Sequence, residues 1–211
     1  MRTLLATAIV IVLLMGGCAK GEPITTKPAP APTDTSVPPT PPPTPASEDR
    51  EKCPERLLDP DEQSGTLGAP GAAPRRPTIE TPDAAWICSY GAKDDGANAG
   101  GATAYTWTRF GDVHPVGSSE LNDLVTSLGG LVPVPNDRAC LSNLGPRWLL
   151  VLERDGQRSG VTIDDFGCGD VLMTDDPFET APGEAQQKGT VPGALNAPPS
   201  LLRQVKTIGS A

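Results

Sequence analysis

A short apolar run at the start of the chain decides how much of the sequence is available to fold. Arg2 precedes an apolar stretch from Leu4 to Met15, and small residues follow it up to Cys18. The stretch is too short to cross a hydrocarbon core of about 30 Å as a helix. Its basic start and small-residue end are typical of a secretory signal. We therefore expect residues 1–17 to be a cleaved signal peptide and the remainder to fold outside the cytoplasm, where disulfides form.

The end of this signal has a more specific pattern. The string Leu14-Met15-Gly16-Gly17-Cys18 resembles the lipobox of bacterial lipoproteins. That resemblance implies cleavage before Cys18 and attachment of a diacylglyceryl group to its sulfur. Two or more acyl chains anchor a protein stably, so the chain would be held at the cell membrane on its extracytoplasmic side. The alternative is an ordinary secreted protein whose signal happens to end near a cysteine.

Proline and threonine dominate the segment after Cys18. Residues 19–49 are rich in both and contain no aromatic side chain. Such a composition cannot bury a core and favours disorder or polyproline II. We assign residues 18–49 to a lipidated cysteine and a disordered stalk. Residues 50–211 then form the extracytoplasmic domain, with its core at about 85–172.

The clearest β signal in this domain is a hairpin. Residues 147–153 and 160–166 have strand-like composition, and the turn signal Asp155-Gly156 lies between them. Residues 148–152 are apolar on both faces, which predicts a central strand. Further strands are expected at residues 85–90 and 104–112, separated by a glycine-rich loop over 91–101.

Leucine periodicity predicts a helix that is capped by Ser118 or Ser119 and ends at Gly129. A second helix is expected after Pro199. Residues 59–77 and 174–199 contain many glycines and prolines and are expected to be irregular. These elements predict an α+β fold, with a small, mainly antiparallel sheet, one helix packed on a face and the C-terminal helix near an edge. The periodic apolar positions are Leu121, Leu124, Val125 and Leu128 in the first helix, and Leu201, Leu202, Val205 and Ile208 in the second.

The cysteines support an exported domain. The chain has five, and setting Cys18 aside leaves an even number, which predicts two disulfides. Four cysteines allow three connectivities. Cys140 and Cys168 lie just outside the two ends of the predicted hairpin, which favours their pairing and leaves Cys53 with Cys88. A zinc site is disfavoured because the spacings include no close C-x-x-C pair.

The order of these motifs resembles that of small exported domains from high-GC Gram-positive bacteria. The resemblance rests on Trp86-Ile87-Cys88-Ser89-Tyr90, the leucine-rich helix before Cys140, the strand at 149–152 and Phe166-Gly167-Cys168. It implies a disulfide-bonded α+β module and no particular activity.

Composition excludes several kinds of chemistry. A formal net charge of −9 argues against binding nucleic acid through a basic surface. The single histidine, His114, is the one available imidazole base, and no G-x-S-x-G turn accompanies it. Asp112 and His114 would share a strand face, but two ligands do not make a metal site, and a solvent-facing loop is the simpler expectation for His114. We therefore assign no catalytic, cofactor-binding or metal-binding residue.

Two other groups of residues have structural interpretations. The acidic pairs Asp94-Asp95, Asp164-Asp165 and Asp175-Asp176 lack the spacing of an EF-hand loop and are expected in solvated turns. Trp86, Trp107 and Trp148 are expected in the core. An anchor, a stalk and a domain without catalytic motifs together favour a binding or accessory module that acts on an unknown envelope protein or ligand. The alternative is an envelope hydrolase with paired carboxylates that the sequence does not identify.

Overall fold

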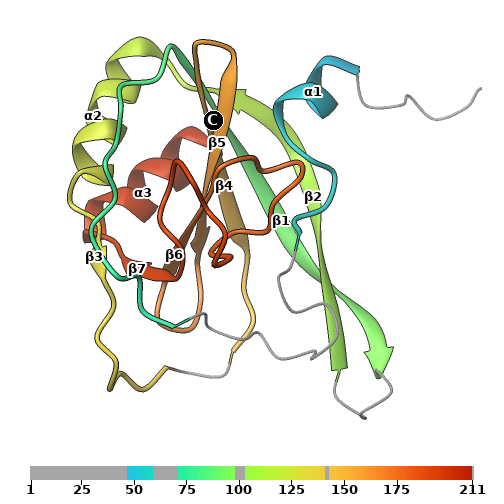
Figure 1. Cartoon of the computed structure of the whole chain (residues 1–211). Helices are drawn as coiled ribbons and strands as arrows, with labels where there is room; N and C mark the ends of the chain where they lie inside the picture. The colour runs from blue at the N-terminus through green and yellow to red at the C-terminus, as the bar shows by residue number, and fades with distance from the viewer. Residues whose placement is uncertain (1–46, 59–70, 98–102, 141–142, 211) are drawn as a thin grey trace, which may run out of the picture. The chain divides into compact units, whose positions relative to one another are not determined.

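A seven-stranded antiparallel sheet is the centre of the domain (Figure 1). The computed structural model describes residues 47–58, 71–97, 103–140 and 143–210, all within one compact unit, Pro43–Ala211. The predicted signal, Cys18 and residues 19–46 of the predicted stalk lie outside the described residues. The strands are β1 (Ala84–Ala97), β2 (Thr103–Pro115), β3 (Val132–Pro133), β4 (Arg147–Arg154), β5 (Gln157–Asp164), β6 (Asp170–Thr174) and β7 (Ala194–Asn196), in the order β2-β1-β4-β5-β6-β7-β3.

Strand β4 is central, as its composition predicts. It pairs with β1, where Leu150 is opposite Ile87, and with β5, where Leu150 is opposite Val161. All three side chains are fully buried. A strand that is apolar on both faces needs cover on both faces, and helices and a disulfide-bonded segment provide it.

Helices α2 (Ser118–Leu128) and α3 (Pro199–Ile208) cover one face, and the short helix α1 (Ser47–Lys52) lies on the other side of the sheet (Figure 1). Leu124 and Leu201 belong to the same core cluster as Ile87 and Leu150. The expectation that the C-terminal helix lies near a sheet edge is wrong, because α3 contacts the central strand β4. Its stripe of buried apolar residues needs a broad apolar surface, and the helix face of β1 and β4 supplies one.

The opposite face holds a second core cluster around a disulfide. Cys53 and Cys88 are fully buried and pack with Tyr90 and Trp107. The segment after Cys53 runs along the outer edge of β2, where the Leu57 N–H donates to the Trp107 carbonyl at 3.0 Å. The Tyr90 hydroxyl donates to the Pro54 carbonyl at 2.7 Å, and burial raises the pKa of Tyr90. The disulfide therefore fixes the segment that covers the second core cluster on this face of the sheet.

Both disulfides have the connectivity that the hairpin favours. Cys53 is bonded to Cys88 with a Cα–Cα distance of 6.5 Å, and Cys140 to Cys168 with 5.0 Å. The first is buried, whereas Cys140 is exposed. Two disulfides indicate an extracytoplasmic location. None of the helices in the described part of the chain is long and apolar enough to cross a membrane.

The predicted hairpin and both predicted helices are confirmed. The turn between β4 and β5 has positive φ at Asp155 (51°) and Gly156 (72°), the type I′ conformation that suits a two-residue hairpin. The cap of α2 differs from the prediction. Its N-cap is Gly117, whose N–H donates to the Glu120 carboxylate at 3.0 Å, so Ser118 and Ser119 lie inside the helix.

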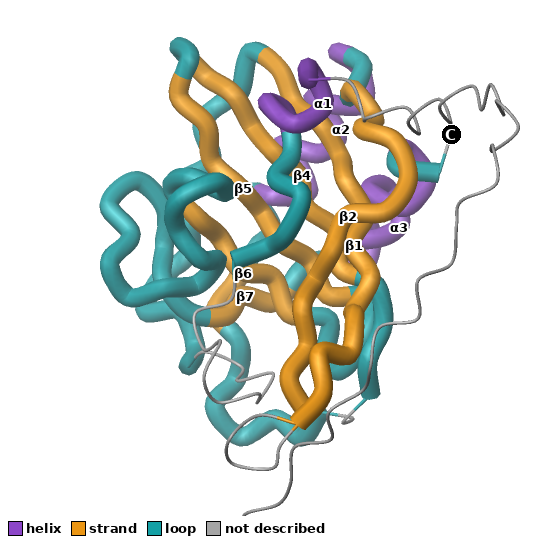
Figure 2. The backbone as a smooth tube through the Cα atoms, turned by 90° about the vertical axis from the view of Figure 1, so that its right-hand side faces the viewer, coloured by secondary structure: helices purple, strands orange, loops and turns teal. Residues whose placement is uncertain are grey.

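Two regions predicted to be irregular contain strands. Residues 91–97 continue β1, and β1 and β2 form a long ribbon that extends past the end of β4 (Figure 2). A register shift between Asp94 and Gly96 and a positive φ at Gly96 accommodate the glycine there. Further along, β7 interrupts the proline-rich region 174–199, and Leu195 and Val191 are fully buried. The core therefore extends beyond the predicted range of 85–172.

Candidate functional site

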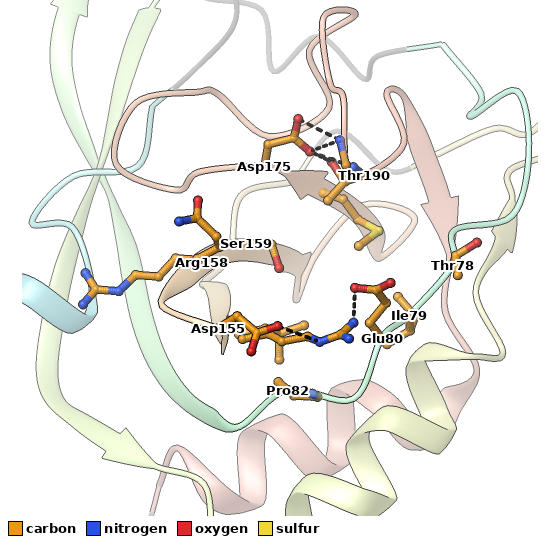
Figure 3. A pocket seen from close by; sticks show the side chains of 14 residues that line it. Thr78, Ile79, Glu80, Pro82, Asp155, Arg158, Ser159, Asp175 and Thr190 are labelled. Atoms are coloured by element: carbon orange, nitrogen blue, oxygen red, sulfur yellow. Dashed lines mark hydrogen bonds and ion pairs between the residues drawn. The ribbon is translucent and has the colours of Figure 1, made fainter.

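The described residues enclose an open cleft of about 600 Å³ on the helix side of the sheet, beyond the helices. Figure 3 shows it bounded by the β4–β5 hairpin, the connection that precedes β1 and the loop that follows β6. This volume lies within the usual range for small-ligand sites. The lining residues are Thr78, Ile79, Glu80, Pro82, Leu152, Arg154, Asp155, Gln157, Arg158, Ser159, Met173, Asp175, Gly189 and Thr190.

The floor of the cleft is apolar. Leu152 and Met173 are buried residues of the main core cluster, and Ile79 packs against that cluster while partly exposed. The strand alternation of β4 and β6 turns both floor side chains toward the helix side of the sheet. Leu152 and Met173 are already shielded from water, so the apolar surface that a ligand could cover here belongs mainly to Ile79.

Charged side chains form the lower rim, and they are paired with one another. The Arg154 guanidinium forms an ion pair with Glu80 and approaches the Asp155 carboxylate at 3.6 Å (Figure 3). The tip of the β4–β5 hairpin is also tied to the segment just before β1, because the Asp155 N–H donates to the Asp83 carboxylate at 2.9 Å. The Arg154, Glu80 and Asp155 side chains are 45%, 69% and 85% exposed, so these ion pairs position the rim more than they stabilise the fold.

The upper wall is organised by Asp175. Its carboxylate accepts hydrogen bonds from the Gly189 N–H at 3.0 Å, the Thr190 N–H at 2.7 Å and the Thr190 hydroxyl at 2.8 Å, and also from the Lys188 N–H. Burial alone would raise the pKa of the Asp175 carboxyl, but the hydrogen bonds from Lys188, Gly189 and Thr190 outweigh it and lower that pKa. The ionised carboxylate therefore holds the wall in place.

The stability of the loop at 188–190 should depend on pH through the ionisation of Asp175. Because the folded-state pKa of Asp175 is lowered, its contribution to stability is fully present above the unfolded value of about 3.9 and is lost as pH falls through the folded pKa. We expect the Lys188, Gly189 and Thr190 amides to exchange with solvent faster at pH 3 than at pH 6, after correction for intrinsic rates. Hydrogen exchange resolved by NMR measures this.

Asp175→Asn is the matched variant for that measurement. Its amide cannot ionise, so the pH-dependent part of the change should disappear, and unfolding should cost about 1–3 kcal/mol less at pH 6 because an acceptor is replaced in part by a donor. Equal pH dependence in the wild type and the variant would contradict the assignment of the effect to Asp175.

The acidic pairs from the sequence do not come together as a site. Asp164 accepts from Arg147 at 2.7 Å, and Asp165 accepts from Lys206 at 2.6 Å. Asp175 binds the loop described above, and Asp94 accepts the Gly96 N–H at 2.7 Å. Within the described ranges, no group of three or more His, Cys, Asp or Glu side chains is placed to hold a metal ion.

The predicted loop position of His114 is wrong. His114 lies inside β2, opposite Ile87, and is half-buried. Pairing with β1 continues to Pro115, so the proline at the end of an edge strand does not interrupt it. Asp112 lies two residues away on the same strand and is exposed.

The tryptophans are structural, as expected. Trp107 and Trp148 are 1% and 7% exposed, and Trp86 is half-buried against the second cluster. Trp107 stacks on Phe166 at 5.3 Å between ring centroids, and the Arg147 guanidinium lies 4.3 Å from the centroid of the Trp107 ring.

The cleft itself was not predicted from the sequence. Its walls come from residues 78–82, 152–159, 173–175 and 189–190, which the fold alone brings together. The one usable signal was the Asp155-Gly156 turn, which places a charged hairpin tip at the end of the sheet.

Fold and cleft together define a disulfide-bonded extracytoplasmic α+β domain with a polar-rimmed, apolar-floored cleft. Comparison with known proteins assigns it no family, since no family model, curated protein or solved structure matches the chain.

Proposed function

We propose that this protein is a lipid-anchored binding module of the cell envelope, which takes its ligand in the cleft and has no catalytic activity. One observation carries the proposal: each carboxylate of the cleft already has a partner, whereas the base of the cleft is apolar. Glu80 and Asp155 are engaged by Arg154, and Asp175 by backbone N–H groups. A general acid or base needs a proton-transfer position free to face the substrate, while a binding site needs buried apolar area with a few fixed polar groups.

Lipidation of Cys18 is the second part of the proposal. It is supported by the lipobox-like string at residues 14–18 and by the extracytoplasmic character of the domain. A lipid on that cysteine and the stalk that follows it would present the cleft to partners or solutes outside the membrane.

Replacing the proposed lipid-bearing residue tests the anchor. In Cys18→Ser the thioether cannot form, so the protein should move from the membrane fraction to the soluble fraction of the producing bacterium, with the domain still folded. Fractionation with immunodetection measures this, and Cys140→Ser controls for loss of a cysteine as such. Retention of the Cys18→Ser protein in the membrane fraction would contradict lipid anchoring.

The cleft is tested by photo-crosslinking in cells. A benzophenone amino acid at Thr78, exposed on the rim, should yield a defined adduct by intact mass. The same amino acid at Thr126, exposed on α2 away from the cleft, should not. Ser159→Trp, which places an indole in the cleft, should abolish the adduct at position 78. An adduct that persists in Ser159→Trp, or equal adducts at both positions, would contradict a ligand in this cleft.

Ser159→Trp also addresses the alternative of an envelope hydrolase. A hydrolase that used an acidic pair outside the cleft, such as Asp94 and Asp95, would keep its activity in this variant, whereas the binding proposal expects function to be lost.

A further inference from the structure

The backbone of β5 is left open where it lines the cleft. β6 pairs with β5 from Gly160, opposite Thr174, to Ile163, opposite Val171. β6 ends at Thr174, and the carboxylate of the following residue, Asp175, binds the loop at 188–190. Among the described residues, no strand therefore continues alongside Gln157, Arg158 and Ser159.

The hairpin geometry shows which backbone groups are exposed there. Arg154 and Gln157 flank a two-residue type I′ turn, so they exchange hydrogen bonds, and the N–H and C=O of Gln157 face β4. Alternation then directs the N–H and C=O of Arg158 away from β4, to the side on which β6 would have continued. The backbone of Arg158 therefore presents one N–H donor and one C=O acceptor that can pair with an added strand.

The Arg158 side chain takes no part in the cleft. Figure 3 shows it running away from the cleft toward α1. Its guanidinium pairs with Glu153 at 3.2 Å, donates to the Glu51 carbonyl and lies 5.5 Å from the Phe178 ring centroid. What Arg158 contributes to the cleft is its backbone.

The facing wall is a second stretch of chain that pairs with no strand among the residues that the structure describes. The connection before β1 is anchored at Ala73, whose N–H donates to the Ala194 carbonyl at 2.9 Å, and at Asp83, whose N–H donates to the Glu153 carbonyl at 2.8 Å. Between these anchors, Thr78, Ile79 and Pro82 line the cleft. The apolar floor of Leu152 and Met173 lies between this wall and the β5 edge.

From these features we infer that the ligand is an extended polypeptide segment of a partner, which adds as a strand to the β5 edge at Arg158. The inference rests on the proposed function and specifies the ligand of the same cleft. Backbone hydrogen bonds would hold the segment, and alternate side chains would lie in the cleft against its apolar base, as in other cases of strand addition.

Charge and composition favour this class of ligand over others. The cleft is lined by three carboxylates, of Glu80, Asp155 and Asp175, against the guanidinium of Arg154, since the Arg158 head group lies outside it. An anionic ligand such as a phosphate would meet net negative charge, whereas a neutral or basic peptide would not. The described lining residues include no aromatic ring on which a sugar could stack.

The test compares two variants at one residue. Arg158→Ala removes the side-chain contacts and keeps the backbone N–H. Arg158→Pro removes both, and proline is tolerated where a strand N–H faces solvent. The probe is a random octapeptide phage library, selected on the full-length protein with the Arg158→Pro protein as competitor, and an enriched peptide is then measured by fluorescence anisotropy.

We expect the peptide to bind the wild type and Arg158→Ala with similar affinity and to bind Arg158→Pro at least about tenfold more weakly, which is the loss of one or more backbone hydrogen bonds. N-methylation of alternate peptide residues should cause a similar loss. The inference would be overturned if the selection enriched no peptide. It would also be overturned if Arg158→Ala and Arg158→Pro were equally stable to heat and bound the peptide equally well. If the molecule crosslinked at position 78 were not a peptide, the inference would be wrong but the proposed binding function would still hold.

Discussion

Removing the buried disulfide should destabilise the domain more than any other change to its cysteines. In Cys53→Ala with Cys88→Ala we expect the free energy of unfolding to fall by about 4–5 kcal/mol. A cross-link with a separation of 35 residues contributes about 3.8 kcal/mol by restricting the unfolded chain. The two sulfurs are fully buried, so their loss also leaves a void in the second core cluster, at a cost of about 1 kcal/mol.

The other disulfide provides the matched control. Cys140 and Cys168 are 28 residues apart, so the entropic contribution is nearly the same, but Cys140 is exposed and its removal leaves no core void. We expect Cys140→Ala with Cys168→Ala to lose about 3.6 kcal/mol in urea unfolding monitored by circular dichroism. Equal losses in the two double variants would contradict the added role of packing around Cys53.

Hydrogen exchange separates the two effects of the buried disulfide. Without it, the segment after Cys53 is tied to β2 by hydrogen bonds such as Leu57 N–H to Trp107 C=O and Arg109 N–H to Glu55 C=O. The amides of Leu57 and Arg109 should then lose protection before the central strands do. Protection unchanged at Leu57 would show that the segment holds its place on β2 without the disulfide.

Local signals in the sequence predicted the parts of the fold that depend on local physics. Asp155-Gly156 forms the turn it indicates because both residues must adopt positive φ, which this pair tolerates. The leucines of α2 and α3 recur at helical spacing because one stripe of each helix faces the sheet. The disulfide pairing followed from the hairpin, since antiparallel strands bring the segments at their open ends together.

The sequence patterns did not predict the features that depend on pairing between segments far apart in the chain. The glycines after Tyr90 indicate a loop, yet they continue β1 because β2 supplies a partner across register shifts. Strand β7 has only three residues, and it exists because β6 and β3 flank it. The cleft depends on where β6 stops pairing, which Asp175 decides by capturing a loop 13–15 residues further on. No local pattern encodes that contact.

The second large effect concerns a charge that lies beside two stacked aromatic rings. The Arg147 guanidinium lies 4.3 Å from the Trp107 centroid and 5.6 Å from the Phe166 centroid, and its Nε donates to the Asp164 carboxylate at 2.7 Å. The two charged side chains are only 13% and 12% exposed. Neither is solvated well by water, so each depends on the other for its stability in the fold.

We therefore expect Arg147→Met to lower the free energy of unfolding by about 3 kcal/mol, because it removes the guanidinium that lies against the buried Asp164 carboxylate. Methionine keeps a polarisable side chain against Trp107, so packing changes little. Adding Asp164→Asn should recover much of the loss, since the charge is then gone from both positions. Arg154→Met, at an exposed ion pair, should cost no more than about 1 kcal/mol. If the double variant unfolds as easily as Arg147→Met alone, the lost stability comes from the contacts of the guanidinium with the rings. It does not then come from the effect on the Asp164 charge.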